Sequence, residues 1–267
     1  MKRIINISVW VILLTGLGFT LGFVNRKEES LPCKSLDVTI QEDPDNFFVQ
    51  PEDVKKLIFE KGDSIVNQPV STLNVAALEK VLNSYSAISK SEVYITINGE
   101  VKVNVRQRKP LIRIIDKNND SYYIDDEGRF MPLSDKYTAK VLLANGNFRE
   151  PYNAHYIYTI KQIESDSNLR DSTIVDDLFE LASYISANTF WKAQIEQIFV
   201  NNEKEIELIP RVGNHRIILG DISYMDEKFK KLLIFYKQGL NPTGWWNNYS
   251  VINLKFRNQV VCTKKQI

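Results

Sequence analysis

Hydrophobic residues recur at two different spacings near the start of the chain, and each spacing predicts a different element. Leu36, Val38 and Ile40 alternate with polar residues, which is the period of a strand with one buried face. Two helices are predicted next, because apolar residues then recur every three or four positions. Pro51 suits the first turn of one helix, and Asn74 can cap the other. Their apolar faces are formed by Val54, Leu57 and Ile58, and by Val75, Leu78, Val81, Leu82 and Tyr85.

The strongest local pattern is a second alternation on either side of Asn98-Gly99. Apolar residues occupy every second position in residues 93–97 and again in residues 101–105. Asn-Gly tolerates the positive φ angles of a type I′ turn, so the pattern predicts a hairpin with both apolar faces on the same side. Strand, helix, helix, strand and strand within residues 36–107 are enough for a small two-layer α+β domain.

The rest of the chain predicts a mostly antiparallel β domain with accessory helices. Short apolar runs predict strands at 122–124, 130–133 and 141–144, and two more within 195–210 about Asn201-Asn202. One helix, capped by Asp171 or Ser172, is expected to run through Ser186, and another, capped by Asp226, to end before Gly239. The residues expected to face the core are Leu178, Leu181, Ala182 and Ile185 in the first helix and Phe229, Leu232, Leu233 and Tyr236 in the second.

An uncharged apolar run lies at the N-terminus. Lys2 and Arg3 are followed by 21 residues, 4–24, without a charge. As a helix this run measures about 31 Å, against a hydrocarbon core of about 30 Å, so it predicts one transmembrane helix. A cleaved signal peptide is the alternative, with Thr20-Leu21-Gly22 as a tolerable cleavage site.

Flanking charges bear on the orientation of this run. Two basic residues precede it, and Arg26 and Lys27 follow it, so the count of positive charges does not choose a side. Glu28 and Glu29 offset the outer pair, and the tail before the run is only three residues long. We therefore expect a cytoplasmic N-terminus and an exported body.

Composition narrows the classes of function. The chain has 267 residues, 43% of them hydrophobic and 25% charged, with a net charge of +1. These values are typical of a globular protein and provide no long-range field for nucleic acid. Its two cysteines, Cys33 and Cys262, form no CxxC pair and no disulfide framework, which argues against structural zinc. A disulfide bond between the two cysteines remains an alternative, although they lie near opposite ends of the exported body.

One segment has the spacing of a calcium loop. Asp116, Asn118, Asp120 and Glu127 occupy positions 1, 3, 5 and 12 of an EF-hand. Ser121, however, stands where the loop needs glycine, and the preceding residues predict a strand rather than a helix. A solvated β-turn accounts for the same residues, so we expect no metal and no cofactor.

Catalytic motifs are missing from the sequence. It has no Gly-x-Ser-x-Gly, no P-loop and no Gly-x-Gly-x-x-Gly, and Cys262 has no base nearby in sequence. His155 and His215 are expected to be structural or exposed. Carboxylates such as those of residues 125–127 could serve glycoside cleavage, but they fall in turns, where Asp and Glu are common. Trp245-Trp246 could stack on a sugar, yet covering the end of a core is the commoner role of such a pair.

Three segments resemble a known family. Residues 101–110, Val-Lys-Val-Asn-Val-Arg-Gln-Arg-Lys-Pro, resemble the Val-x-Val-x-x-Arg-x-Pro stretch that closes the POTRA domain of the FtsQ/DivIB cell-division proteins. Residues 123–128 resemble the Tyr-x-Asp-x-x-Gly hairpin that opens the family's β domain. Residues 251–256 resemble its terminal strand, with Asn253 and Lys255 where the family often has Asp and Arg. The resemblance covers nearly the whole chain in order.

The end of the chain is a candidate binding site. If residues 250–257 and 258–264 are the last strand and its extension, they form a sheet edge that could accept a partner strand. The cationic side chains of Lys255, Arg257, Lys264 and Lys265 would either blunt this edge against aggregation or select an acidic partner. The resemblance implies FtsB-like and FtsL-like single-span division proteins as partners. By analogy, the expected contact residues are Lys255, Phe256, Asn258 and Val260.

These interpretations give one layout and one function. The expected segments are a cytoplasmic tip (1–3), a transmembrane helix (4–24), a linker (25–34), a POTRA-like domain (35–110), a β domain (111–260) and a C-terminal tail (261–267). The resemblance implies a non-enzymatic scaffold of the bacterial cell-division machinery, in the inner membrane at the septum, that binds no nucleic acid and no small-molecule substrate. Two alternatives stay open: an anchored cell-wall enzyme using Asp125, Asp126 or Glu127 as acid or base, and a POTRA-bearing secretion or assembly component.

Overall fold

The computed structural model describes residues 10–17, 31–41, 43, 46–59, 65–152 and 158–266. The chain divides into two compact units, residues 1–107 and 108–267. Each unit has its own sheet, so the units are described separately. Both cysteines are free thiols, Cys33 buried and Cys262 half-buried.

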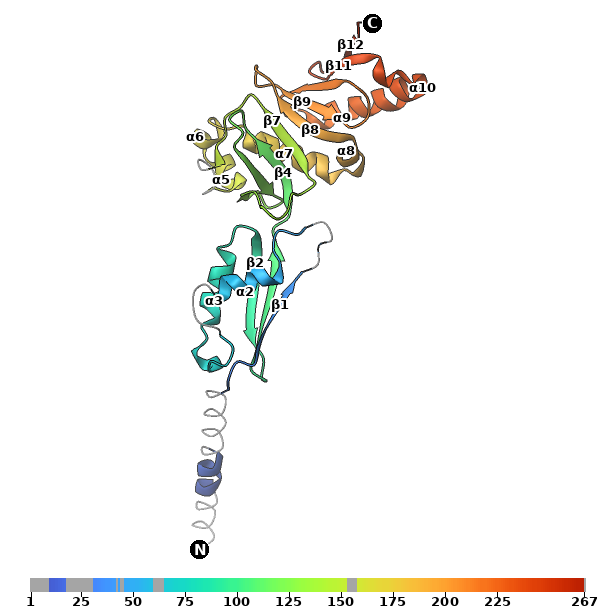
Figure 1. Ribbon diagram of the computed structural model, residues 1–267. Helices are drawn as coiled ribbons and strands as arrows, with labels where there is room; N and C mark the ends of the chain where they lie inside the picture. Colours follow the sequence, from blue (N-terminus) through green and yellow to red (C-terminus); the bar gives the residue numbers. More distant parts are fainter. Residues whose placement is uncertain are drawn as a thin grey trace. The chain divides into compact units, whose positions relative to one another are not determined.

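The first unit is a three-stranded sheet with helices packed on it (Figure 1). Its strand order is β1-β3-β2, with β1 parallel and β2 antiparallel to the central strand. The side chains of Val101, Val103 and Val105 on β3 are buried, which confirms the alternation predicted for this strand. The elements are β1 (Ser35–Ile40), α2 (Pro51–Phe59), η1 (Val70–Thr72), α3 (Val75–Asn83), β2 (Ile88–Ile95) and β3 (Glu100–Gln107).

The β2–β3 hairpin is as predicted, but its turn is not. Gly99 has a φ of +81°, whereas Asn98 keeps a negative φ, so a type I′ turn is excluded. The carbonyl of Thr96 instead accepts a hydrogen bond from Gly99 N at 2.9 Å. The hairpin therefore closes with a glycine bulge. Ile97, expected on the apolar face, lies in this turn with 92% of its surface exposed.

Helix α3 begins where the sequence predicts and also covers the edge of β2. Asn74 caps the helix by accepting a hydrogen bond from Ala77 N at 3.0 Å. The side chain of Asn83 accepts one from Ser91 N, and that of Glu79 accepts one from Val93 N, both at 2.8 Å. Side chains of α3 thus occupy backbone donors of β2 that a further strand would need.

The N-terminal prediction falls mostly outside the described residues. Residues 10–17 are helical, and their large apolar side chains are exposed. None of the helices in the described part of the chain combines the length and apolar character needed to cross a membrane. Residues 31–34 were expected in a linker. Residues 31–33 pair with residues 67–70, and Lys34 N donates a hydrogen bond to the carbonyl of Gly99 at 2.8 Å.

The second unit contains a nine-stranded sheet. Its strand order is β12-β11-β10-β9-β8-β7-β4-β5-β6. Most neighbouring strands are antiparallel, as expected, but β11 pairs with β10, β8 with β7 and β7 with β4 in parallel. The strands are β4 (Pro110–Ile115), β5 (Ser121–Asp125), β6 (Phe130–Met131), β7 (Leu142–Gly146), β8 (Ile195–Val200), β9 (Ile206–Pro210), β10 (Arg216–Gly220), β11 (Tyr249–Asn253) and β12 (Val261–Lys264). The expected tail therefore contains the last strand.

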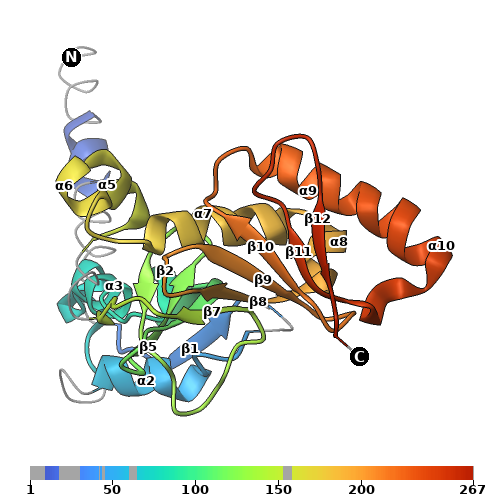
Figure 2. The ribbon, with the colours of Figure 1, turned by 90° about the horizontal axis from the view of Figure 1, so that it is seen from above.

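Helices α7, α8 and α9 lie along one side of this sheet (Figure 2). The core between them contains all four residues predicted to face inward from α7. It also contains Phe229 of α9, Leu232 of α9 and Tyr236 of η2, whereas Leu233 is only partly buried. The helices are α5 (Ile160–Ser165), α6 (Ser167–Arg170), α7 (Val175–Ala187), α8 (Thr189–Gln194), α9 (Met225–Ile234), the π-helix η2 (Phe235–Leu240), α10 (Asn241–Thr243) and η3 (Trp245–Asn247).

The predicted starts of both helices and the predicted end of the second were wrong in this unit, whereas α7 ends at Ala187, one residue after the predicted end. Helix α7 starts after Ile174, whose amide is bound by the carboxylate of Glu150 at 3.0 Å rather than by Asp171 or Ser172. Helix α9 starts after Tyr224, which has a φ of +57°, and Asp226 lies inside its first turn. The helical path also continues past Gly239 and stops at Gly244, where φ is +66°. Tertiary contacts, which the local pattern does not contain, decide these ends.

Candidate partner-binding edge

Terminal strands of the two sheets differ in how far their outer sides are occupied. The outer side of β2 is bonded by side chains of α3, and β6 has only two residues, both buried. Strand β1 also ends its sheet, but the charges beside it are mixed, because Asp37 pairs with Lys102 at 3.6 Å. Strand β12 is different: it ends the large sheet, and the charged residues on it and next to it in the sequence, Arg257, Lys264 and Lys265, are all basic.

Pairing with β11 fixes which way the backbone of β12 points. Lys265 N donates to the carbonyl of Asn248 at 3.0 Å, which places Lys264 opposite Tyr249 in a non-hydrogen-bonded pair. Because donor direction alternates along a strand, Cys262 and Lys264 direct N–H and C=O away from β11. In the described part of the chain no strand lies beyond them. Two residues can therefore offer their donors and acceptors to an added strand.

The four residues expected to contact a partner lie beside this edge and not on it. Lys255, Phe256, Asn258 and Val260 belong to the turn that joins β11 to β12. The strand stops at Asn253, whose side chain accepts a hydrogen bond from Lys255 N at 2.9 Å. Such an Asx turn competes with continued strand pairing. The expected continuous strand over residues 250–257 is therefore corrected to a strand, a turn and a second strand.

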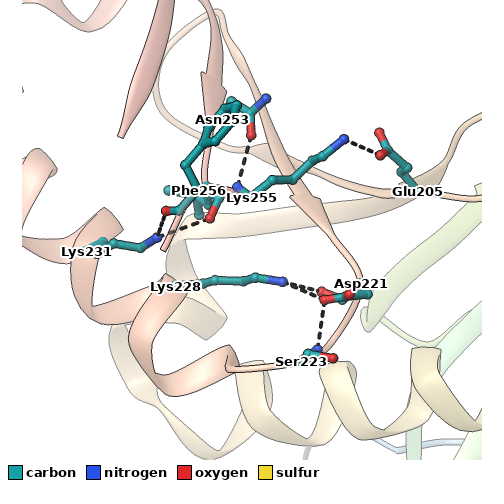
Figure 3. Close-up of polar contacts among 9 residues, drawn as sticks. Glu205, Asp221, Ser223, Lys228, Lys231, Asn253, Lys255 and Phe256 are labelled. Atoms are coloured by element: carbon teal, nitrogen blue, oxygen red, sulfur yellow. Dashed lines mark hydrogen bonds and ion pairs between the residues drawn. The ribbon is translucent and has the colours of Figure 1, made fainter. Parts of the chain in front are cut away.

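Lysines of α9 hold this turn and the loop before the helix (Figure 3). The ammonium of Lys231 donates to the carbonyls of Leu254 and Phe256, at 3.1 and 2.5 Å. That of Lys228 is buried and bonds both the carboxylate and the carbonyl of Asp221 at 2.8 Å. This ion pair lowers the pKa of Asp221.

Lys255 has a partner within the chain. Its ammonium pairs with the carboxylate of Glu205, 50 residues earlier in the sequence, and this contact raises the pKa of Lys255 (Figure 3). The sequence suggested that Lys255 selects an acidic partner, whereas the structure gives its charge an internal counterpart.

The C-terminal segment around β12 is rich in basic residues. Residues 228–267 contain eight Lys and Arg and no Asp or Glu. Lys264 is exposed on β12, and the guanidinium of Arg257 stacks over the ring of Tyr224 at 4.5 Å. Both stacked side chains are exposed, and so are Phe256 in the turn and Val261 on β12. An open edge with apolar and cationic neighbours fits an extended segment that carries carboxylates.

The sequence alone indicates only part of this candidate site. A run of 40 residues without an acidic side chain marks the basic end of the chain. The roles of Lys231 and of the outward backbone of β12 are not visible in any local pattern, because both depend on contacts between distant segments.

The carboxylates considered for catalysis have structural roles where the structure fixes them. Asp125 is buried and accepts hydrogen bonds from Glu127 N, Arg129 N and the guanidinium of Arg108, at 3.0, 2.7 and 2.9 Å. Asp126 is exposed, and its pKa is raised by partial burial and by Asp125 and Glu127 beside it. The three donors occupy the Asp125 carboxylate and organise the turn.

The segment with EF-hand spacing forms a turn. The carboxylate of Asp116 accepts hydrogen bonds from the backbone amides of Asn118, Asp120 and Glu150, at 2.8, 3.0 and 3.2 Å. Its oxygens therefore satisfy main-chain donors, as the β-turn interpretation predicted. Over the described residues, no group of three or more His, Cys, Asp or Glu side chains is placed to hold a metal ion.

His215 is structural. It is buried between the hydroxyl of Tyr236 and the carbonyl of Trp246, at 3.3 and 3.4 Å. Burial lowers its pKa. Trp246 packs on His215 and Tyr236, so it covers one end of the core as expected. His155 lies outside the described residues.

The two units define a class of protein before any comparison is made: an α+β chain in which a small βααββ domain precedes a large sheet with an open C-terminal edge. Residues 31–106 match the model of the POTRA-like domain. Residues 109–263, more than half of the chain, match the model described as FtsQ/DivIB, C-terminal related, and the chain belongs to the FtsQ/DivIB family. A search of curated proteins found no match.

Family membership confirms the resemblance drawn from the sequence motifs, and it confirms a POTRA-like domain followed by a β-sheet domain. FtsQ/DivIB proteins are in general non-enzymatic division proteins, and their domains indicate a cell-division scaffold that acts through protein–protein interactions.

Proposed function

We propose that this protein is a single-pass membrane scaffold of the bacterial divisome that binds its partners by strand addition at β12. The observation that carries the proposal is the open side of β12, where Cys262 and Lys264 direct backbone groups outward, in a C-terminal segment, residues 228–267, that contains no Asp or Glu. A partner segment that is extended and acidic would satisfy both features.

The partners proposed are FtsB-like and FtsL-like single-span division proteins. Of the four contact residues predicted from the sequence, Phe256 and Asn258 are exposed in the turn, and Val260 packs against the core. These residues and Lys255 would line the side of the added strand, while β12 provides the hydrogen bonds. Localisation in the inner membrane at the septum, with the N-terminus in the cytoplasm and the POTRA-like and β domains outside it, belongs to the same proposal.

Photocrosslinking in growing cells tests this function. A photoreactive phenylalanine analogue replaces Val261 on β12 or Phe256 in the turn, and Tyr94 on β2 is the control. Tyr94 is comparably exposed but lies on a strand whose outer donors are already bonded by α3. We expect capture of small single-span proteins at Val261 and Phe256, capture of none at Tyr94, and a septal band of the fluorescently tagged chain. Even distribution around the cell, with no capture at Val261, would exclude the proposed function.

A further inference from the structure

We propose that Lys231 is a positioning residue for partner binding, because it holds the β11–β12 turn and thereby the edge strand in the form that accepts a partner. This inference rests on the proposed function and names a residue that acts without touching the partner. It follows from where the ammonium lies and from what else supports β12.

Lys231 acts where the pairing of the sheet ends. Leu254 N donates a hydrogen bond to the carbonyl of Ile218 at 2.9 Å. This is the last hydrogen bond between this segment and β10. The Lys231 ammonium takes the carbonyls of Leu254 and Phe256 just beyond that point (Figure 3). The ammonium of Lys231 therefore binds two carbonyl groups, one on each side of Lys255, that lie beyond the last hydrogen bond of the strand pairing.

A lysine in this place is held by carbonyls and not by a carboxylate. The neighbouring acid, Asp221, is bonded to Lys228. Burial and the nearby charge of Lys228 lower the pKa of Lys231, so its surroundings disfavour the charge that its two hydrogen bonds use. Such an arrangement fits a side chain that organises backbone rather than one that pairs with a surface acid.

Edge strand β12 depends on this turn. It has four residues and is paired on one side only, to β11. A short edge strand frays easily when its connection loosens. Because a partner binds only the paired form, its apparent affinity falls in proportion to the population of that form. Removing the Lys231 ammonium should therefore weaken partner binding while the core of the second unit stays folded.

The test compares three variants of the full-length chain. Lys231→Met removes the ammonium, Lys231→Arg keeps a donor that can reach the carbonyls, and Lys230→Met removes a neighbouring exposed charge as the matched control. Capture through a crosslinker at Val261 is measured in cells. Hydrogen exchange of Thr263 N, which faces β11, and of Ile217 N in β10 is measured on the protein in detergent micelles.

We expect Lys231→Met to lower capture about tenfold and to speed exchange at Thr263 by a similar factor, with exchange at Ile217 unchanged. Arginine should restore most of both signals, and Lys230→Met should change neither. Equal effects of Lys231→Met and Lys230→Met, or none from Lys231→Met, would overturn the inference. If the wild-type chain captures nothing at Val261, the proposed function fails, and exchange at Thr263 then decides the role of Lys231 in holding β12.

Discussion

Loss of the ion pair between Arg108 and Asp125 should destabilise the second unit strongly. The pair joins Arg108, two residues before β4, to Asp125, the last residue of β5, with 2.9 Å between the guanidinium and the carboxylate. Both side chains are desolvated, at 9% and 1% exposure. Arg108→Met leaves the buried carboxylate with two backbone amides, and Asp125→Asn leaves a buried guanidinium without its counter-charge.

The size of the effect follows from burial. Removing one partner of a buried ion pair lowers the free energy of unfolding by about 3–5 kcal/mol, because the remaining charge stays buried without its counter-charge. With a urea dependence of about 2 kcal/mol per molar, the unfolding midpoint should fall by roughly 1.5–2.5 M. The matched control is Arg129→Met, which removes a 3.7 Å pair with Glu127 between half-exposed side chains of the same turn. An exposed pair contributes about 0–1 kcal/mol, so the control should shift the midpoint little.

Tryptophan fluorescence in urea is the assay, since three of the four tryptophans, Trp191, Trp245 and Trp246, lie in the second unit. The double variant should be destabilised by less than the sum of the two single variants, because it leaves no unpaired charge. Single variants that shift the midpoint no more than Arg129→Met, or a double variant equal to the sum, would show that the pair does not act as a buried unit.

Three further predictions test other parts of the fold. Burial lowers the pKa of His215 in the folded state, so the unfolded state binds its proton first and stability should fall as the pH drops below about 6.5. His215→Gln should reduce this loss between pH 7.5 and 5.5 in urea titrations, and an unchanged pH dependence would contradict it. Glu79→Ala should speed hydrogen exchange at Val93 N by removing its 2.8 Å acceptor, whereas Lys80→Ala on the same helix should not. Gly146→Ala should prevent regular pairing of β7 with β8, because a Cβ there would lie 2.1 Å from the carbonyl oxygen of Val200, and an unchanged melting temperature would refute this.

Periodicity predicted the elements that bury one face of a regular structure. Val101, Val103 and Val105 alternate because one face of β3 is buried, and the inward positions of α7 recur at helical spacing for the same reason. These patterns are local, so the sequence alone contains them. The order of elements in the first unit followed directly.

Features that depend on distant segments were not predicted. Glu150 accepts a hydrogen bond from the amide of Ile174, just before α7, and Glu205 neutralises Lys255, across 24 and 50 residues of sequence. Strand β12 has four residues, too few for a clear period, so the sequence predicts it only as an extension of the last strand that runs into the C-terminal tail. The four contact residues predicted from the sequence lie in the turn beside β12, and their contact with a partner stays a prediction.

The most direct test of the central claim separates the outward amide of Lys264 from its charge. Lys264→Gln removes the charge only, whereas Lys264→Pro also removes the N–H that an added strand would bond and leaves the pairing with β11 intact. Capture of a partner at Val261 is measured in cells for both variants, after their melting temperatures have been shown to agree. Strand addition predicts that the glutamine variant captures the partner and that the proline variant loses most of that capture. Equal capture by the two folded variants would contradict binding through the edge of β12.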